Sequence, residues 1–208
     1  MTAKLKPNDV VRAVNRERAT RAIAMFLEAL GYDLTREDLI ETPNRVVAAY
    51  ADELLIGDQT DLAGLIVEGS QSLEGELEAA PPGLVLVKDI TVAAVCPHHL
   101  LPALGRASVA YLPGKRLLGL GTVAHVVDAC ARGLALQESI GERVVQALMT
   151  HAGARGALCR LELQHTCMAA RGAKQAESQL VTLARGGALA ESSSDAELLL
   201  AFSSEMKP

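Results

Sequence analysis

Aromatic side chains are scarce in this chain of 208 residues: they make up 2% of the sequence, and tryptophan does not occur. Proteins that bind single-stranded nucleic acid stack the bases on aromatic rings, so the chain lacks the side chains for such a surface. Positive charge is also in short supply, because 20 Lys and Arg stand against 25 Asp and Glu, a net charge of −5. A general nucleic-acid binder is normally basic, and this class of protein is therefore disfavoured.

Long apolar runs are missing as well, since none reaches the length of about 20 residues that a membrane-spanning helix needs. The first residues, Met-Thr-Ala-Lys-Leu-Lys, lack the apolar core of a signal peptide. The four cysteines are few for a chain of this length, and without a secretion signal they indicate free thiols rather than a disulfide framework. We therefore expect a cytoplasmic protein that does not contact a membrane.

The residues that are present allow a sizeable core, because half of them are apolar and 22% are charged. The length suits one large domain or a domain with a helical extension. Near the N-terminus, apolar side chains at helical spacing predict a helix from Arg16 to Leu30, and Gly31 has the position of a residue that ends a helix. The chain is therefore expected to begin with a helical region.

A second helix is expected to follow the first. Thr42 as N-cap and Pro43 at the first helical position predict its start, and apolar residues at helical spacing continue it to about Leu55. Residues 57–82 are rich in Gly, Asp, Glu and Ser and show little periodicity. We interpret them as a linker or a long surface loop, with one short strand near residues 65–67.

Strand-like apolar runs dominate the chain from residue 84 onward. The expected elements are strands over 84–95 and 104–112, a short piece over 117–120, helices over 122–132 and 137–150, strands over 157–166 and 180–184, and a last helix from the Ser194–Glu197 capping box to about Phe202. This order indicates an α+β fold with a mainly antiparallel sheet. We divide the chain into an N-terminal helical region (1–57), a linker (58–82) and the main domain (83–208).

Two short segments bring metal-binding residue types to the ends of two expected strands. Residues 96–99 read Cys-Pro-His-His, and residues 165–167 read His-Thr-Cys. Side chains two apart on a strand share a face, so His165 and Cys167 are expected to point the same way. The cysteine and the second histidine of the first segment are three apart across a proline turn, which is close enough to bind one ion. Two thiolates and two imidazoles suit Zn²⁺.

The other two cysteines do not fit this site. Cys159 precedes Cys167 by eight residues on the same expected strand, and at about 3.3 Å per residue the two lie roughly 26 Å apart. Cys130 lies on the apolar face of a predicted helix and is expected in the core.

Two kinds of zinc site fit the remaining residues. Cys96, Cys167 and one histidine of the 98–99 pair, with an open fourth position, describe a catalytic zinc, where a bound water can ionise near neutral pH. The other histidines are then free to move protons. A closed structural site takes a fourth protein ligand instead, either His98 or His165. The spacing leaves both kinds of site open.

Several motifs together, in order and spacing, resemble the GTP cyclohydrolase I family. They are residues 41–45 (ETPNR), 96–102 (CPHHLLP), 105–113 (GRASVAYLP), 119–120 (GL), 127–128 (VD), 137–138 (QE) and 165–172 (HTCMAARG). The similarity runs from about residue 20 to the C-terminus. It implies the tunnelling fold (T-fold), an antiparallel sheet with helices on one face, here with an N-terminal helical extension. Subunits of this fold join their sheets into a barrel and usually stack as a decamer, so we expect a homo-oligomer.

The resemblance also implies roles for the metal-binding segments. Cys96, His99 and Cys167 match the zinc ligands of the family. His98 and His165 match the histidines that transfer protons. The implied cofactor is therefore one zinc ion in a catalytic site.

The implied substrate contacts lie elsewhere in the chain. Glu138, with Gln137 beside it, matches the carboxylate that holds the 2-amino-pyrimidinone edge of guanine, which suits a carboxylate that accepts from adjacent N–H donors. Arg45 and Arg171 match cations of the family's site. The implied reaction opens the imidazole ring of GTP hydrolytically, releases formate and yields 7,8-dihydroneopterin triphosphate.

Departures from the family concentrate at the residues that contact the triphosphate. Gly121 and Thr122 stand where the family has Ser and Lys, His125 stands where Arg is common, and Ala48 replaces a Lys. Charge-assisted contacts contribute about 1.5–3 kcal/mol each, so these losses amount to roughly a thousandfold or more in affinity. Other cations compensate, or the substrate is a guanine compound without the triphosphate. Pro97, which replaces the Glu of the family's C-E-H-H, motivates a third hypothesis, a non-catalytic T-fold protein that binds purine or zinc.

Overall fold

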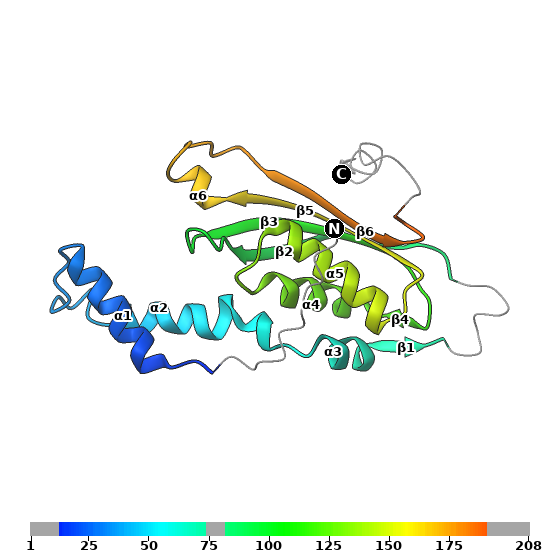
Figure 1. Ribbon diagram of the computed structural model, residues 1–208, viewed down its shortest axis with the longest axis horizontal. Coiled ribbons are helices and arrows are strands. Elements are labelled where there is room, and N and C mark those ends of the chain that lie inside the picture. Colours follow the sequence, from blue (N-terminus) through cyan, green and yellow to red (C-terminus); the bar gives the residue numbers. More distant parts are fainter. Residues whose placement is uncertain (1–12, 74–81, 191–208) are drawn as a thin grey trace, which may run out of the picture.

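The computed structural model of the protein describes residues 13–73 and 82–190 (Figure 1). Its elements are α1 (Arg16–Ala29), α2 (Thr42–Ala48), a π-helix (Ala49–Leu54), a 3-10 helix (Ile56–Gln59), α3 (Leu62–Glu68), β1 (Ser70–Ser72), β2 (Val85–Val95), β3 (Pro102–Leu112), β4 (Arg116–Leu118), α4 (Leu120–Ala131), α5 (Gln137–His151), β5 (Gly156–His165), α6 (Thr166–Ala169) and β6 (Leu180–Gly187). The helix predicted over 194–202 lies outside the described residues. The α+β prediction is confirmed.

The predicted N-terminal helices are present, with one change at the start of the second. The side chain of Asn15 caps α1 by accepting a hydrogen bond from the Arg18 backbone N–H at 2.9 Å. Glu41, not Thr42, has the N-cap position of α2, and its side chain makes no capping bond. The predicted N-cap was therefore wrong by one residue, within the usual uncertainty of a helix end. Pro43 lies in the first turn, as expected, because its missing N–H has no partner there.

The strand expected near residues 65–67 is wrong, because α3 occupies this stretch. The carboxylate of Asp61 caps the helix by accepting from the N–H groups of Ala63 and Gly64 at 3.0 Å each. Ile66 is fully buried against the core. A short apolar run does not distinguish a strand from a buried helical turn, so only the packing against the core decides between them.

The four long strands form one antiparallel sheet in the order β2-β3-β5-β6, and β1 pairs with β4 in a second, small sheet. Val95 at the end of β2 pairs with Pro102 at the start of β3. The next residue of β3, Ala103, pairs with His165 at the end of β5. Antiparallel pairing therefore brings the two predicted metal-binding segments to the same edge of the sheet, the one at which β2 and β5 end and β3 begins.

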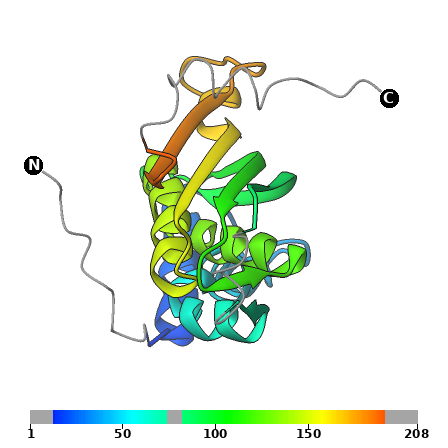
Figure 2. The same cartoon turned by 90° about the vertical axis from the view of Figure 1, so that its right-hand side faces the viewer.

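One face of the sheet carries the core. Alternate residues of β5, from Ala157 to Leu163, point into it, as the period of two predicts. α4 and α5 pack on this face through Val126, Val144 and Leu148, which are completely buried, and Figure 2 shows both helices on the same side of the strands. No helix among the described residues is both long and apolar enough to cross a membrane.

β5 ends earlier than predicted. Its last residue is His165, and Cys167 belongs to the short helix α6. The prediction that His165 and Cys167 share one face of a strand is therefore wrong. The hydroxyl of Thr166 donates to the carbonyl of Pro102 at 2.6 Å, which fastens the start of α6 to β3 at the point where the chain leaves the sheet.

Candidate active site

The loop after β2 is closed by its own backbone. The N–H of Cys96 donates to the Leu101 carbonyl and the N–H of Leu100 donates to the Cys96 carbonyl, both at 2.9 Å. Leu100 has a φ of 56°, which is uncommon for a residue other than glycine. This turn holds Cys96 and His99 on the same side of the loop.

Cys96, His99 and Cys167 form a cluster in which the potential ligand atoms all lie within 4.8 Å of one another. The two sulfur atoms are 3.8 Å apart, and the Cys96 sulfur is 3.7 Å from Nδ1 of His99. In a tetrahedral zinc site with ordinary bond lengths, two sulfurs lie about 3.8 Å apart, and a sulfur and a nitrogen lie about 3.6 Å apart. The donor set and its spacing therefore fit one zinc ion.

The cluster is accessible from solvent. Cys96 is buried at the end of its strand, Cys167 is half-buried and His99 is exposed. Partial burial and the neighbouring Cys96 thiol raise the pKa of Cys167, while the nearby Arg171 guanidinium lowers it. A bound cation would favour both thiolates, because a coordinating thiol is deprotonated.

His98 lies beside the cluster and is exposed. Its ring and that of His99 meet edge to face, with centroids 6.2 Å apart. Among the described residues, the three-residue cluster contains neither His98 nor His165. The structure therefore gathers three potential ligands and leaves the other two histidines of the two segments, His98 and His165, outside them.

His165 is held by the first residue of α5. Its Nε2 lies 2.9 Å from the side-chain oxygen of Gln137. Burial lowers the pKa of His165, and the carboxylate of Glu138 acts in the opposite direction. Leu134, which shortly precedes α5, forms a bridge with Val95 at the end of β2. The start of α5 therefore lies at the same edge of the sheet as the cluster.

The predicted substrate contacts are distributed unevenly around this edge. Glu138 is exposed in the first turn of α5, and its negative charge acts to raise the pKa of His165. Arg171 is exposed after α6, and its positive charge acts to lower the pKa of Cys167. Arg45 is exposed on α2, in the N-terminal helical part of the protein, and no described interaction joins it to the cluster.

The sequence analysis missed Tyr50. Its hydroxyl donates to the carbonyl of Leu100 in the candidate metal-binding loop (residues 96–101), and it does so from the π-helix that continues α2. A π-helical turn shifts the direction of the following side chains, and such turns are frequent at functional sites. Apolar spacing predicts an ordinary helix here, so the sequence offered no signal for this contact.

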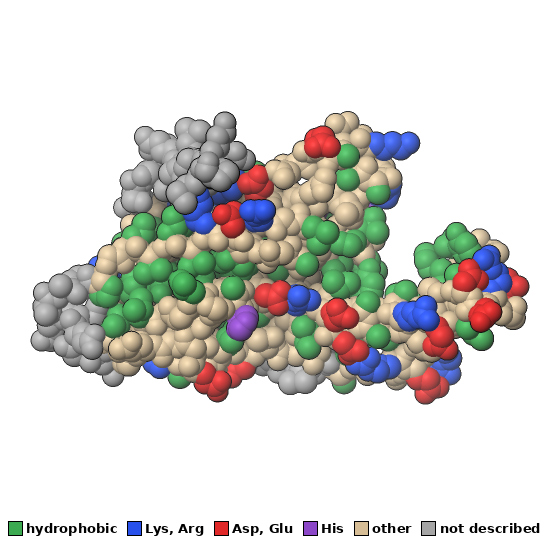
Figure 3. Space-filling view, turned by 180° about the vertical axis from the view of Figure 1, so that it is seen from behind, with side chains coloured by type: hydrophobic (Ala, Val, Ile, Leu, Met, Phe, Trp, Pro, Cys, Tyr) green, Lys and Arg blue, Asp and Glu red, His purple; other side chains and the backbone are tan. Residues whose placement is uncertain are grey.

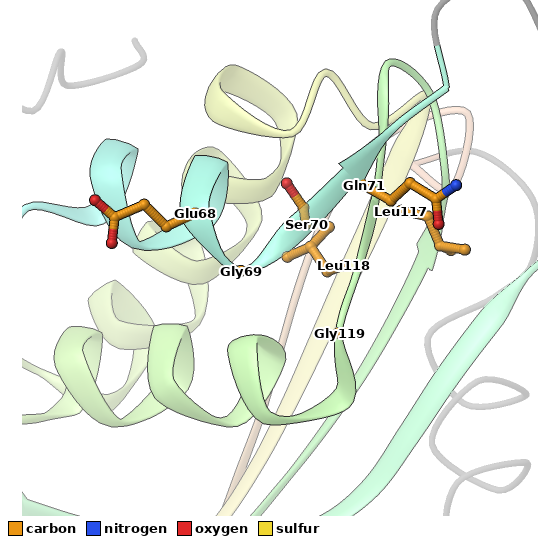
Figure 4. Close-up of a pocket in the computed structure, with 7 residues that line it drawn as sticks. All are labelled: Glu68, Gly69, Ser70, Gln71, Leu117, Leu118 and Gly119. Carbon is orange, nitrogen blue, oxygen red and sulfur yellow. The ribbon is translucent and has the colours of Figure 1, made fainter.

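The start of α4 lies far from the cluster. An open pocket of about 380 Å³ is lined by residues 68–71 and 117–119 (Figure 4), at the end of the sheet marked by β4, opposite α6 (Figure 1). Thr122 is buried there, and its hydroxyl donates to the carbonyl of Gly69 at 2.7 Å. Gly121 and His125 are exposed. Within one chain, these positions and the cluster are therefore separate.

Cys130 lies in the core, as predicted, and Cys159 lies there as well. Burial raises the pKa of Cys130 to about 11 and that of Cys159 to about 12. Cys159 pairs with Val109 and Ala184 in the middle of the sheet, away from the edge that carries the cluster. Neither thiol contributes to the candidate site.

Comparison with known proteins agrees with the site. The sequence profile of the family described as GTP cyclohydrolase I matches residues 19–203. GTP cyclohydrolase 1 of Leifsonia xyli subsp. xyli is 39% identical over 185 residues, covering 89% of this chain and 94% of that protein. GTP cyclohydrolase 1 of Bifidobacterium longum (strain NCC 2705) is 36% identical over 200 residues, covering 92% and 96%.

A solved structure, the archaeosine synthase QueF-Like in the apo form, matches over 51% of this chain and 95% of its own, with 18% identity and a TM-score of 0.39. The sequence matches are more extensive, because the profile and the relatives each span most of the chain. This protein therefore belongs to the GTP cyclohydrolase I family of hydrolytic enzymes.

Proposed function

We propose that this protein is a zinc-dependent GTP cyclohydrolase that opens the imidazole ring of GTP, releases C8 as formate and yields 7,8-dihydroneopterin triphosphate. The observation that supports it best is the convergence of Cys96, His99 and Cys167 from segments 71 residues apart, in a chain of this family. We further propose that the protein works as a homo-oligomer whose sheets join into a barrel.

Cys96, His99 and Cys167 would hold the zinc ion. A zinc ion with three protein ligands supplies a Lewis acid that lowers the pKa of a water molecule in its fourth position. Because the cluster among the described residues has three members and an exposed side, a catalytic site is better supported than a closed structural one. His98 and His165 are the groups that we assign to proton transfer, since both lie next to the cluster and outside it.

We assign recognition of the guanine edge to Glu138. Its exposed carboxylate lies at the N-terminal end of α5, and a carboxylate can accept two hydrogen bonds from adjacent N–H donors such as those of a 2-amino-pyrimidinone. Arg171 provides a positive charge near Cys167. We keep Arg45 in the proposed site as a phosphate contact. It lies on α2, and no described interaction joins it to the cluster, so its contribution depends on how subunits assemble.

A second candidate function is ring opening of a guanine compound without the triphosphate. The hydroxyl of Thr122 is engaged by Gly69, and Gly121 has no side chain, so neither supplies the cation or free hydroxyl that the family uses at these positions. Ala48 and His125 also lack the positive charge expected there. Within one chain, residues at the start of α4 lie at the other end of the sheet from the Cys96–His99–Cys167 cluster. They can therefore take part in the site only if another subunit supplies them.

Substrate turnover tests these functions directly. The zinc-loaded protein is incubated with GTP, GMP, guanosine and guanine, and formate release is measured. Turnover of GTP at micromolar concentration supports the first function and removes the second, whereas turnover of GMP or guanosine alone reverses this conclusion. A protein inert on all four compounds contradicts both and supports the non-catalytic T-fold hypothesis. In an active protein, a His98→Ala variant with unchanged activity contradicts the role of His98 in proton transfer.

A further inference from the structure

The side chain of Gln137 is enclosed by protein groups. It is 3% exposed, although it is the first residue of a helix. Its amide nitrogen faces the carbonyls of Leu180 at 2.8 Å and Leu161 at 3.2 Å, and the hydroxyl of Thr182 at 3.2 Å. All three partners belong to β5 and β6, so the amide joins the start of α5 to the sheet.

These contacts determine which way the amide points. A carbonyl oxygen only accepts hydrogen bonds, and the side-chain amide of glutamine donates only through its nitrogen. The opposite orientation would place the Gln137 oxygen against the carbonyls of Leu161 and Leu180. The oxygen must therefore face His165, whose Nε2 lies 2.9 Å away.

The amide orientation in turn selects one form of the neutral His165 ring. Nε2 faces an oxygen that can only accept, so Nε2 carries the proton, and Nδ1 carries the lone pair. A neutral imidazole in water exchanges between two tautomers, and a hydrogen bond to one nitrogen decides which nitrogen is basic. The arrangement is that of a histidine oriented by an acceptor group behind it.

We propose that Gln137 is a positioning residue: its side-chain oxygen holds the Nε2–H of His165 and so fixes the ring in one tautomer, with Nδ1 as the basic nitrogen. The resemblance to the family assigns Gln137 to substrate binding, but its enclosed side chain favours this other role. The effect on catalysis rests on the proposed function, whereas the effect on the ring does not.

The alternative is that Gln137 only fastens α5 to the sheet through its N–H donors. Two substitutions separate these roles. Gln137→Met removes both the acceptor and the donors, while Gln137→Glu keeps an acceptor oxygen for His165 and loses the N–H groups that bind Leu161 and Leu180. In catalytic triads a carboxylate likewise holds a histidine in one tautomer, by accepting from the ring N–H that faces it. Gln146→Met, at an exposed position on the same helix, is the matched control.

The kinetic test uses the zinc-loaded full chain and GTP. We expect Gln137→Met to lower kcat by about 10- to 100-fold with little change in KM, because proton transfer by a positioned group contributes about 10²- to 10⁴-fold and the variant loses part of this contribution. Gln137→Glu is expected to recover at least about tenfold of that loss, and Gln146→Met to match the wild type. Equal losses in Gln137→Met and Gln137→Glu would overturn the proposal, since both lack the donors.

A spectroscopic test is independent of activity and of the folding of Gln137→Met. Long-range ¹H–¹⁵N spectra of the full chain with ¹⁵N-labelled histidine are recorded at pH 8, with His165 assigned by comparison with His165→Gln. We expect a protonated Nε2 and an unprotonated Nδ1 in the wild type and a retained Nε2–H in Gln137→Glu. The reverse tautomer or an even mixture in the wild type overturns the proposal. The expected spectrum in a protein inert on GTP supports it and contradicts the proposed reaction.

Discussion

The four cysteines of this protein lie in two different chemical environments. Cys130 and Cys159 are completely buried in apolar surroundings, and burial raises the pKa of each thiol, to about 11 and about 12. Cys96 and Cys167 lie at the edge of the sheet with a histidine beside them. Because the thiolate is the metal ligand, only the second pair is suited to hold zinc.

Zinc content tests this division of the cysteines. We expect Cys167→Ala to lower bound zinc from about one ion per protomer to a small fraction of that, because two remaining ligands do not hold the ion tightly. Cys130→Ala is the control and should keep its zinc. The measurement is metal analysis of the purified proteins, and zinc retained by Cys167→Ala would contradict the proposed ligand set.

The buried thiols also predict how stability depends on pH. In the unfolded chain a thiol ionises near its ordinary pKa of 9.0, whereas the folded protein keeps Cys159 protonated to about pH 12. The unfolded state therefore loses its proton first, and the free energy of unfolding falls as pH rises above about 9. The loss is about 1.4 kcal/mol between pH 8 and pH 10 for this thiol.

Urea unfolding at pH 8 and pH 10 measures this dependence. Cys159→Ala is less stable at both values, because a core side chain is shortened, but its stability should fall less between them than that of the wild type. An equal fall in both proteins would show that Cys159 ionises in the folded state as easily as in the unfolded one.

At the scale of elements, the candidate metal-binding loop contacts a helix that precedes it by 40 residues or more. The π-helix Ala49–Leu54 directs the hydroxyl of Tyr50 to the carbonyl of Leu100. Leu100 is the residue with positive φ that closes the turn after His99. The hydrogen bond therefore stabilises the backbone conformation that brings Cys96 and His99 together.

Removal of this hydroxyl should weaken zinc binding. A hydrogen bond contributes about 1 kcal/mol, so we expect Tyr50→Phe to raise the zinc dissociation constant about fivefold, measured by competition with a chelator. Tyr32→Phe changes a tyrosine that is 54% exposed and serves as the control. An unchanged constant in Tyr50→Phe would show that the loop holds its shape without the π-helix.

The sequence predicted the helices and strands best where a periodic apolar pattern extends over many residues. The strands β2, β3 and β5 and the helices α4 and α5 were all predicted close to their observed ends, since each has many residues that alternate or repeat toward one core face. α3 was predicted as a strand because its apolar run is short. The end of β5 was predicted beyond His165 because the bond from Thr166 to Pro102 is invisible in the sequence.

At the scale of the whole molecule, α1 lies outside the hydrophobic core. None of its residues is buried, and Met25, Phe26 and the C-cap residue Leu30 are 59–67% exposed. Figure 3 shows hydrophobic side chains at the end of the molecule formed by α1. Exposed apolar surface of this kind marks an interaction site, which agrees with the homo-oligomer that we propose.

The oligomeric state tests this interpretation. We expect Phe26→Glu to shift the protein to smaller species, because a charge cannot be buried in an apolar contact without a large cost. Glu28→Gln, an exposed change on the same helix, should leave the assembly intact. Size-exclusion chromatography with light scattering gives the mass. An unchanged assembly in Phe26→Glu would place the α1 surface outside the subunit contacts.

Local residue patterns were enough to predict the α+β class and a mainly antiparallel sheet, because periodicity is a property of neighbouring residues. Ligand chemistry limited the zinc candidates to Cys96, Cys167 and the 98–99 histidine pair, and the family resemblance selected His99. The register that pairs Val95 with Pro102 and Ala103 with His165, the bond between Tyr50 and Leu100, and the enclosure of Gln137 depend on contacts between distant segments. Such contacts form only when the core packs, so no local pattern records them.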